Sequence, residues 1–213
     1  MSDAQEMEKE ALKEEVKSQV EEVCACPETY PDWDGKQIDL GGTCVHEMKI
    51  AAFFHMPVAY DMYVSKQAAN IDHLDLKEKW PGLILTKTGW FGGKIMRLLE
   101  DSESPSRLVH YLPGSFWVQC QLHHGGIGTV PKAVHKMQIE MVEKGFIPKE
   151  FYLAHLTCPV CVERKGGEDK ILIVRRFVAN KRIQDRLQKE AEKQARKAEK
   201  VAKEVKAPET AEA

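Results

Sequence analysis

Residues 114–178 read GSFWVQCQLHHGG, IGTVPKAVHKMQIEMVEKG, FIPKEFYLAHLTCPVC and VERKGGEDKILIVRRFV. This succession of patterns predicts a strand, a helix, a strand, a turn and a strand. Residues 116–122 are rich in β-branched and aromatic types, which favour a strand, and two more strands follow at 151–157 and 170–178. The glycine-rich residues 166–169 form the hairpin connection between the last two strands.

The helix inside this segment has a start signal, an apolar face and a stop signal. Thr129 is a good N-cap, and Pro131 is tolerated in the first turn of a helix. Lys144 and Gly145 supply a basic last turn and a glycine just after it. The apolar face is made of Val134, Met137, Met141 and Val142. One βαββ unit of this kind leaves a sheet face uncovered, so it needs a partner.

The same order of elements occurs once more, closer to the N-terminus. A strand is predicted at 48–54, a helix at 58–79, and two short strands at 94–99 and 107–112, with residues 83–93 as a linker. No residue-level repeat accompanies this order. The sequence therefore predicts an α+β fold, in which two βαββ units form one antiparallel sheet with both helices on one face. The other face would hold a ligand groove between the halves.

Composition excludes several classes of protein. A chain of 213 residues with a net charge of −2 gives no sign of a nucleic-acid partner. It has no long apolar run for a membrane span and no secretory signal, so we expect a cytoplasmic protein without membrane contact. Six cysteines in such a compartment are expected to be thiols or metal ligands rather than disulfides.

Three regions are expected: an acidic helix with a cysteine-containing loop at 1–42, the ligand-binding domain at 43–178, and a basic helix with a disordered tail at 179–213. Opposite charge favours contact between the two terminal helices, within one chain or as a coiled coil in a homodimer. A solvated surface helix is the plain alternative. The alanine stripe of the C-terminal helix lacks the large apolar anchors that interfacial membrane helices use.

Several local motifs resemble those of the GyrI-like (gyrase-inhibitor-like) small-molecule-binding family, over residues 43–178. They are Gly114-Ser-Phe-Trp117 to His124-Gly-Gly126, Thr129-Val-Pro131, Glu143-Lys-Gly-Phe-Ile-Pro148, and the polar segment from Leu99 to Arg107. The resemblance implies a pseudo-twofold pair of βαββ units and an aromatic-lined cleft. The same family supplies the effector domains of multidrug-responsive regulators. Members that bind cationic drugs place a glutamate on the strand after the second helix, whereas here Glu150 precedes the predicted strand. This departure argues against cation binding and against the hydrolytic activity of some relatives.

Four cysteines form the most specific candidate for a metal or redox site. They are Cys24, Cys26, Cys158 and Cys161, arranged as CxC and CPVC. Two thiolate pairs brought together suit a tetrahedral soft metal such as zinc. A CxxC pair can also carry out dithiol–disulfide exchange, and inert thiols are the plain alternative.

The candidates for the lining of the cleft are aromatic residues and histidines: His55, Trp90, Tyr111, Trp117, His124, Tyr152 and His155. His55 and His124 follow the first strands of the two halves, so a shared metal, haem or other tetrapyrrole is one alternative for them. Hydrogen-bonding histidines and core aromatics are the other.

Two functions of different classes follow. The first is an intracellular small-molecule-binding protein that senses, carries or sequesters an apolar or aromatic ligand. The second is a metal-binding or redox enzyme that uses the cysteines and histidines. No nucleophile–base pair is apparent, so the sequence leaves catalysis open. A third hypothesis is an assembly factor that acts through its terminal helices.

Overall fold

A computed structural model describes residues 26–27, 29–158, 161–162 and 168–205. The main sheet contains β1 (Gln37–Asp39), β2 (Cys44–Ile50), β5 (Leu85–Thr88), β6 (Gly93–Leu98), β7 (Val109–Tyr111), β8 (Trp117–His124), β9 (Phe146–His155) and β10 (Lys170–Ala179). The remaining elements are the hairpin of β3 (Ala52–Phe53) and β4 (Met56–Pro57), the helices α2 (Tyr60–His73), α3 (Val130–Glu143) and α5 (Lys181–Val205), and the 3-10 turn η1 (Ile127–Thr129).

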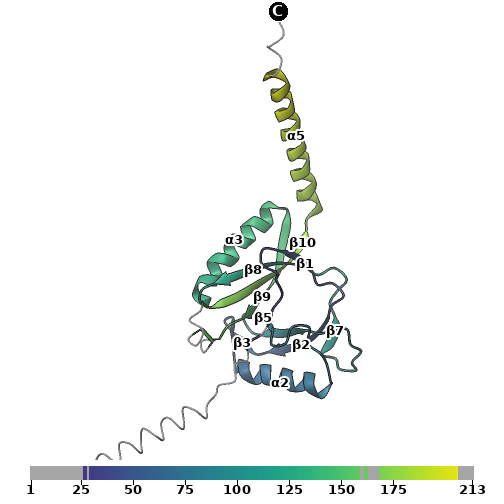
Figure 1. Ribbon diagram of the computed structural model, residues 1–213, viewed down its shortest axis with the longest axis vertical. Coiled ribbons are helices and arrows are strands. Elements are labelled where there is room, and N and C mark those ends of the chain that lie inside the picture. Colours follow the sequence, from purple (N-terminus) through teal and green to yellow (C-terminus); the bar gives the residue numbers. More distant parts are fainter. Residues whose placement is uncertain (1–25, 28, 159–160, 163–167, 206–213) are drawn as a thin grey trace, which may run out of the picture.

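The sheet has eight strands in the order β1-β8-β10-β9-β5-β6-β2-β7, and every pairing between them is antiparallel. Its two halves are β2-α2-β5-β6 and β8-α3-β9-β10, which meet where β5 pairs with β9. The predicted α+β class and the doubled βαββ order are confirmed. The sheet is strongly curled, with α2 and α3 on its outer side at opposite ends (Figure 1).

Both helices cover the same face of the sheet, as the pattern predicted. Thr86 of β5 lies opposite Leu153 of β9, so their side chains share a face. The hydroxyl of Tyr60 in α2 is 2.7 Å from the Thr86 hydroxyl, while Leu153 packs in the cluster beneath α3. The other, concave face is therefore free of helices in the described part of the chain.

The packing beneath α3 is apolar. Met137 and Met141 are buried against Ile171 and Ile173 of β10, in the same cluster as Phe177. The helix ends as predicted, because the Gly145 N–H donates to the Val142 carbonyl with φ at 78°. Thr129 precedes the helix as predicted, but its hydroxyl donates to the Gly126 carbonyl instead of capping the helix.

A buried polar chain lies beneath α2. The Gln67 amide donates to the His46 carbonyl at 3.0 Å, and its oxygen accepts from Arg97 Nε at 3.1 Å. Arg97 Nη1 in turn donates to Glu78 at 2.6 Å. His46, Gln67 and Arg97 are all buried. The helix of the first half therefore packs partly on hydrogen-bonded polar groups, in contrast to the apolar packing beneath α3.

The concave face carries a core of its own. Side chains from strands of both halves, among them Val45, Leu85 and Tyr152, pack there with three loop residues that cover them, Leu40, Leu112 and Phe116. The predicted groove between the halves is therefore filled with side chains over this apolar part of the concave face.

Three predicted boundaries in the first half were wrong. The predicted linker 83–93 contains β5, in which Leu85 is buried while Thr86 faces the helix side. The predicted second strand of the hairpin is β7, which pairs instead with β2 at the sheet edge. Residues 74–79 lie beyond α2, whose last residue is His73. Lysine and glycine residues around β5 concealed its two-residue alternation.

The prediction for β9 was wrong in a way that concerns the site. The strand begins at Phe146, five residues before the predicted start, so Glu150 lies in the middle of the strand. It shares a face with Tyr152, two residues further along. Glu150 therefore lies within the strand that follows the second helix, and not before it as the sequence predicted.

The terminal helices are described only in part. The predicted acidic helix and Cys24 lie outside the described residues, so its pairing with the basic helix stays a prediction. Figure 1 shows α5 extending away from the sheet. No helix in the described ranges has the length and apolar character needed to cross a bilayer.

Candidate ligand-binding face

Five charged side chains form a row across the concave face. They are Glu47 of β2, Lys94 of β6, Lys87 of β5, Glu150 of β9 and Arg176 of β10, and we call them the charged row. The strands that carry them are consecutive neighbours in the sheet. Their side chains are between 21% and 35% exposed, so this part of the concave face meets solvent.

Strand alternation explains why the charged row shares a face with the concave core. Met96 lies two residues beyond Lys94, Tyr152 two beyond Glu150, and both are in that core. Residues two apart on a strand point to the same side. Each half contributes: β2, β5 and β6 supply three members and β9 and β10 supply two.

Glu150 is the centre of the charged row. Its two oxygens accept hydrogen bonds from Lys87 and Arg176, each at 2.7 Å, and Lys94 Nζ lies 4.0 Å from Oε1. Burial alone would raise the pKa of this carboxyl, but those hydrogen bonds and the nearby lysine charges lower it to about 2. Lys94 also pairs with Glu47 at 2.7 Å. Glu150 is therefore ionised at neutral pH and is a weak base.

Two aromatic rings border the charged row. Lys94 Nζ lies 5.6 Å from the centroid of the Tyr152 ring, and the guanidinium carbon of Arg176 lies 4.5 Å from that of the Phe116 ring. At these distances cations are attracted to the faces of aromatic rings. Phe116 was not among the predicted site residues; the sequence predicted it as the first residue of a strand, whereas it lies just before β8.

The Tyr152 hydroxyl is a buried polar group beside the charged row. Tyr152 is 1% exposed, and its hydroxyl interacts with the Glu150 carboxylate but has no hydrogen-bond partner of ordinary geometry within the described residues. Burial raises its pKa, and the nearby Glu150 and Glu47 carboxylates raise it further, so the hydroxyl keeps its proton. Buried polar groups usually have partners, so this one is a candidate to meet a ligand.

Two of the predicted lining residues lie at an exposed aromatic patch, which consists of Phe53, Phe54, Met56, Trp90 and Phe91. Trp90 is 59% exposed at the β5–β6 turn. His55 lies in the β3–β4 turn, and the centroid of its ring is 5.7 Å from that of the Trp90 ring. The β3–β4 hairpin is held there because the His55 N–H donates to the Gly89 carbonyl.

The other predicted lining residues are distributed over separate places. Trp117 lies on the helix side of the sheet, at a cavity of about 560 Å³ shared with Phe146 and Phe177. Tyr111 lies on the edge strand β7, where it donates to the Asp101 carboxylate at 2.5 Å. His124 is exposed at the end of β8, 3.7 Å from Glu168. Tyr152 is therefore the predicted residue that borders the charged row, and His55 and His124 belong to different surroundings.

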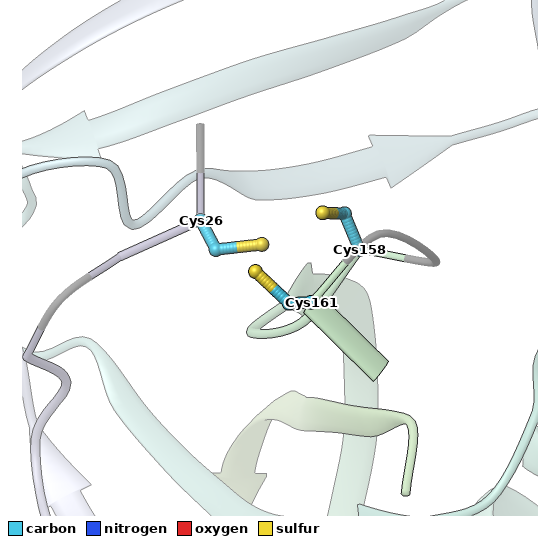
Figure 2. A group of neighbouring side chains, drawn as sticks. All are labelled: Cys26, Cys158 and Cys161. Atoms are coloured by element: carbon cyan, nitrogen blue, oxygen red, sulfur yellow. The ribbon is translucent and has the colours of Figure 1, made fainter. Parts of the chain in front are cut away.

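His155 and two of the cysteines line a cavity of about 220 Å³ at the far end of β9. There Cys26, Cys158 and Cys161 come together, with ligand atoms within 4.8 Å of one another. Figure 2 shows the three side chains pointing toward one another from two separate segments. Three of the four predicted metal ligands are thus close neighbours, and the fourth, Cys24, lies outside the described residues.

Comparisons with known proteins give two findings. A family model described as "Bacterial hydrolase" matches residues 16–177. The crystal structure of the C-terminal domain of EcmrR has a similar fold, with a TM-score of 0.51 and 9% identity, over 68% of this chain and 96% of that one. At this identity the likeness concerns the fold alone. A search of curated proteins finds no match.

Proposed function

This chain belongs to the family described as bacterial hydrolase, and from that membership we propose that it binds a small molecule on its concave face, at the charged row. The observation that carries the proposal is the buried Tyr152 hydroxyl, which has no hydrogen bond of ordinary geometry in the described part of the chain and lies beside a row of solvent-facing charges. The GyrI-like resemblance, which implies a ligand site between two βαββ halves, supports the same location.

The charges of the row favour one class of ligand. The charged row contains three cationic side chains and two carboxylates, and both oxygens of Glu150 already accept hydrogen bonds. A cationic ligand would have to displace Lys87 or Arg176 from Glu150. An acceptor oxygen, in contrast, can be met by a remaining N–H of Lys94 without breaking a pair, and by the buried Tyr152 hydroxyl once the ring shifts to expose it. We therefore propose a flat apolar or aromatic molecule that carries a carbonyl, carboxylate or sulfonate oxygen.

The cellular role that follows is sensing, carrying or sequestering such a molecule in the cytoplasm. A homodimer formed through the terminal helices would bring two of these faces into one assembly. The GyrI-like relationship itself is part of this proposal, and it rests on the local motifs and on the doubled βαββ arrangement.

The test uses two dyes of opposite charge, anilinonaphthalene sulfonate and the cationic acridine orange. We expect saturable binding of the sulfonate, seen in tryptophan and dye fluorescence, and weaker binding of the cation. Lys94→Met should weaken sulfonate binding about tenfold or more, because a hydrogen bond to a charged group contributes about 1.5–3 kcal/mol. Circular dichroism checks that the variant is folded.

The matched control addresses the exposed aromatic patch, which could also bind a dye. Phe91 is 82% exposed and lies outside the charged row, so Phe91→Ser should leave sulfonate affinity within about twofold. If Phe91→Ser abolishes binding while Lys94→Met keeps it, the dye binds the aromatic patch and the proposal is wrong. Tighter binding of acridine orange than of the sulfonate would contradict the proposed ligand class.

The family description favours hydrolysis as a second function of the same face. Glu150, with a pKa of about 2, is poorly suited to accept a proton from water. Glu47, which pairs with Lys94 alone among the described residues, is the carboxylate we assign to that step. Product formation from a panel of aryl esters, followed by mass spectrometry, tests it. Turnover lost in Glu47→Gln supports hydrolysis at this face, and turnover unchanged in that variant contradicts the assignment.

A further inference from the structure

Three cysteine side chains converge beyond the end of β9, apart from the residues of the charged row. Cys26 precedes β1, whereas Cys158 and Cys161 follow β9, so residues more than 130 positions apart in sequence meet here. Their sulfur atoms all lie within 4.8 Å of one another. The close-up in Figure 2 shows the thiols directed into one common space between the two segments.

The local backbone explains why two of the thiols share a side. The Val162 N–H donates to the Cys158 carbonyl at 3.0 Å, so the chain turns helically just after β9. Such a turn places residues three apart on the same side, and Cys158 and Cys161 have that spacing. The CxxC spacing is one that structural zinc sites use repeatedly.

The distances suit a metal ion better than they suit a chance cluster. Zinc binds thiolates at about 2.3 Å with tetrahedral geometry, so two bound sulfurs are about 3.8 Å apart. The separation here, at most 4.8 Å, is larger by no more than about 1 Å. Rotation about one side-chain bond moves a sulfur by that amount, so ligation requires no rearrangement of the backbone.

The chemistry of the site separates it from the two buried cysteines. Burial raises the pKa of Cys120 to about 12 and also raises that of Cys44, so both stay protonated thiols in the core. Cys26, Cys158 and Cys161 are instead half-buried, next to the cavity that His155 and Thr157 line. An ion can reach them, and thiolate ligands favour zinc over magnesium or calcium.

We propose that Cys26, Cys158 and Cys161 bind one zinc ion, which fastens the segment before β1 to the connection after β9. A tetrahedral ion has a fourth position, which these three thiolates leave to another ligand. The role is structural, because metal binding to the folded chain adds its free energy to folding. The site is separate from the charged row and goes beyond the proposed ligand binding.

The first test measures metal on the purified full chain. Elemental analysis should find close to one zinc per chain, and Co²⁺ added to the metal-depleted, reduced protein should give thiolate-to-cobalt charge-transfer absorption with intense tetrahedral bands. Absence of stoichiometric zinc after reconstitution, or a weak octahedral cobalt spectrum, would overturn the proposal. This measurement needs no variant, so it holds even if a cysteine substitution prevents folding.

The second test uses variants and a matched control. Cys158→Ser and Cys26→Ser should each lower bound zinc at least about tenfold, whereas Cys120→Ala, which alters a core thiol, should keep it. Equal zinc content in all three would overturn the proposal. So would an intact mass two hydrogens lighter under non-reducing conditions, lost in Cys158→Ser, because a disulfide would then occupy the thiols.

Discussion

The two βαββ halves have one topology and two kinds of interior. Beneath α3, Met137 and Met141 pack against Ile171 and Ile173, and the Arg175 guanidinium carbon lies 5.7 Å from the centroid of the Phe151 ring in the same cluster. Beneath α2, the corresponding space holds Gln67, His46 and Arg97, joined by hydrogen bonds. The fold therefore needs the space under each helix to be filled, but it does not require the filling to be apolar, and it tolerates a buried His46 Nε2 that has no hydrogen-bond partner in the described part of the chain.

The largest expected effect concerns the polar half. Arg97 is 6% exposed, and its ion pair with Glu78 is almost as buried. Arg97→Met should lower the free energy of unfolding by about 3–5 kcal/mol, because it leaves the largely buried Glu78 carboxylate without its cation and the Gln67 amide oxygen without a donor. Urea unfolding followed by circular dichroism measures the change.

The control for Arg97 is an exposed ion pair. Lys36 pairs with Asp32 at 2.6 Å, but their side chains are 52% and 86% exposed. Lys36→Met should change stability by less than about 1 kcal/mol. Similar losses in Lys36→Met and Arg97→Met would contradict the view that the first half depends on its buried polar chain.

The next effect concerns the apolar half. Met137 is 3% exposed in the cluster beneath α3. Met137→Ala should lower the free energy of unfolding by about 2–5 kcal/mol, since it removes buried apolar surface and leaves a cavity. Urea unfolding of Met62→Ala, whose side chain is 60% exposed on α2, supplies the control and should show little change.

This difference between the halves explains which parts of the fold the sequence predicted well. The stripe of Met137 and Met141, bounded by Thr129 and Gly145, predicted α3 to within a residue or two. In α2 the buried positions are Gln67 and Ile71, so the apolar period is weak and the predicted helix extended too far at both ends. Periodicity detects apolar packing and misses packing by paired polar groups.

The site was harder to predict for a related reason. On the strands of the charged row, charged side chains alternate with apolar ones. The sequence therefore predicts a linker where β5 lies and places Glu150 outside its strand. Tyr152 was found because aromatic residues are expected at ligand sites. The contact of Cys26 with Cys158 and Cys161 was expected from their chemistry, although spacing alone does not specify which distant segments meet.

A third prediction concerns pH. Burial lowers the pKa of His46 below its ordinary 6.5, so this histidine is neutral in the folded chain. Below about pH 6.5 the unfolded chain binds more protons at this site, and the free energy of unfolding should fall as pH drops from about 7 to about 5. Partial burial also lowers the pKa of His155, in the second half, and because the residue is exposed overall its share of the slope should be the smaller one. Urea unfolding of His46→Gln and of His155→Gln at each pH shows which half is responsible for the fall in the free energy of unfolding.

The Glu150 carboxyl titrates in a lower window and can be separated. Its pKa falls from 4.5 to about 2 on folding, so its contribution to stability is present above about pH 4.5 and is lost as pH falls toward 2. Glu150→Gln should therefore leave the slope between about pH 7 and 5 unchanged. A slope in that range that disappears in Glu150→Gln and persists when both histidines are replaced would contradict this assignment.

The smallest expected change in stability lies at the seam between the halves, at Tyr152. Removal of this buried hydroxyl, which has no hydrogen bond of ordinary geometry in the described part of the chain, leaves no other group unpaired, because Glu150 keeps its bonds from Lys87 and Arg176. Tyr152→Phe should therefore alter the free energy of unfolding by less than about 1 kcal/mol, or raise it. A large loss in urea unfolding would mean that the hydroxyl has a structural role.

The same substitution gives the most direct test of the ligand site. Isothermal titration calorimetry compares the affinity of anilinonaphthalene sulfonate for the unaltered chain and for Tyr152→Phe. If the hydroxyl donates to the ligand beside the charged row, the variant should bind about tenfold or more weakly while it unfolds at the same or a higher urea concentration. Equal affinity, within about twofold, in a variant of unchanged stability would contradict a ligand site on the concave face at Tyr152.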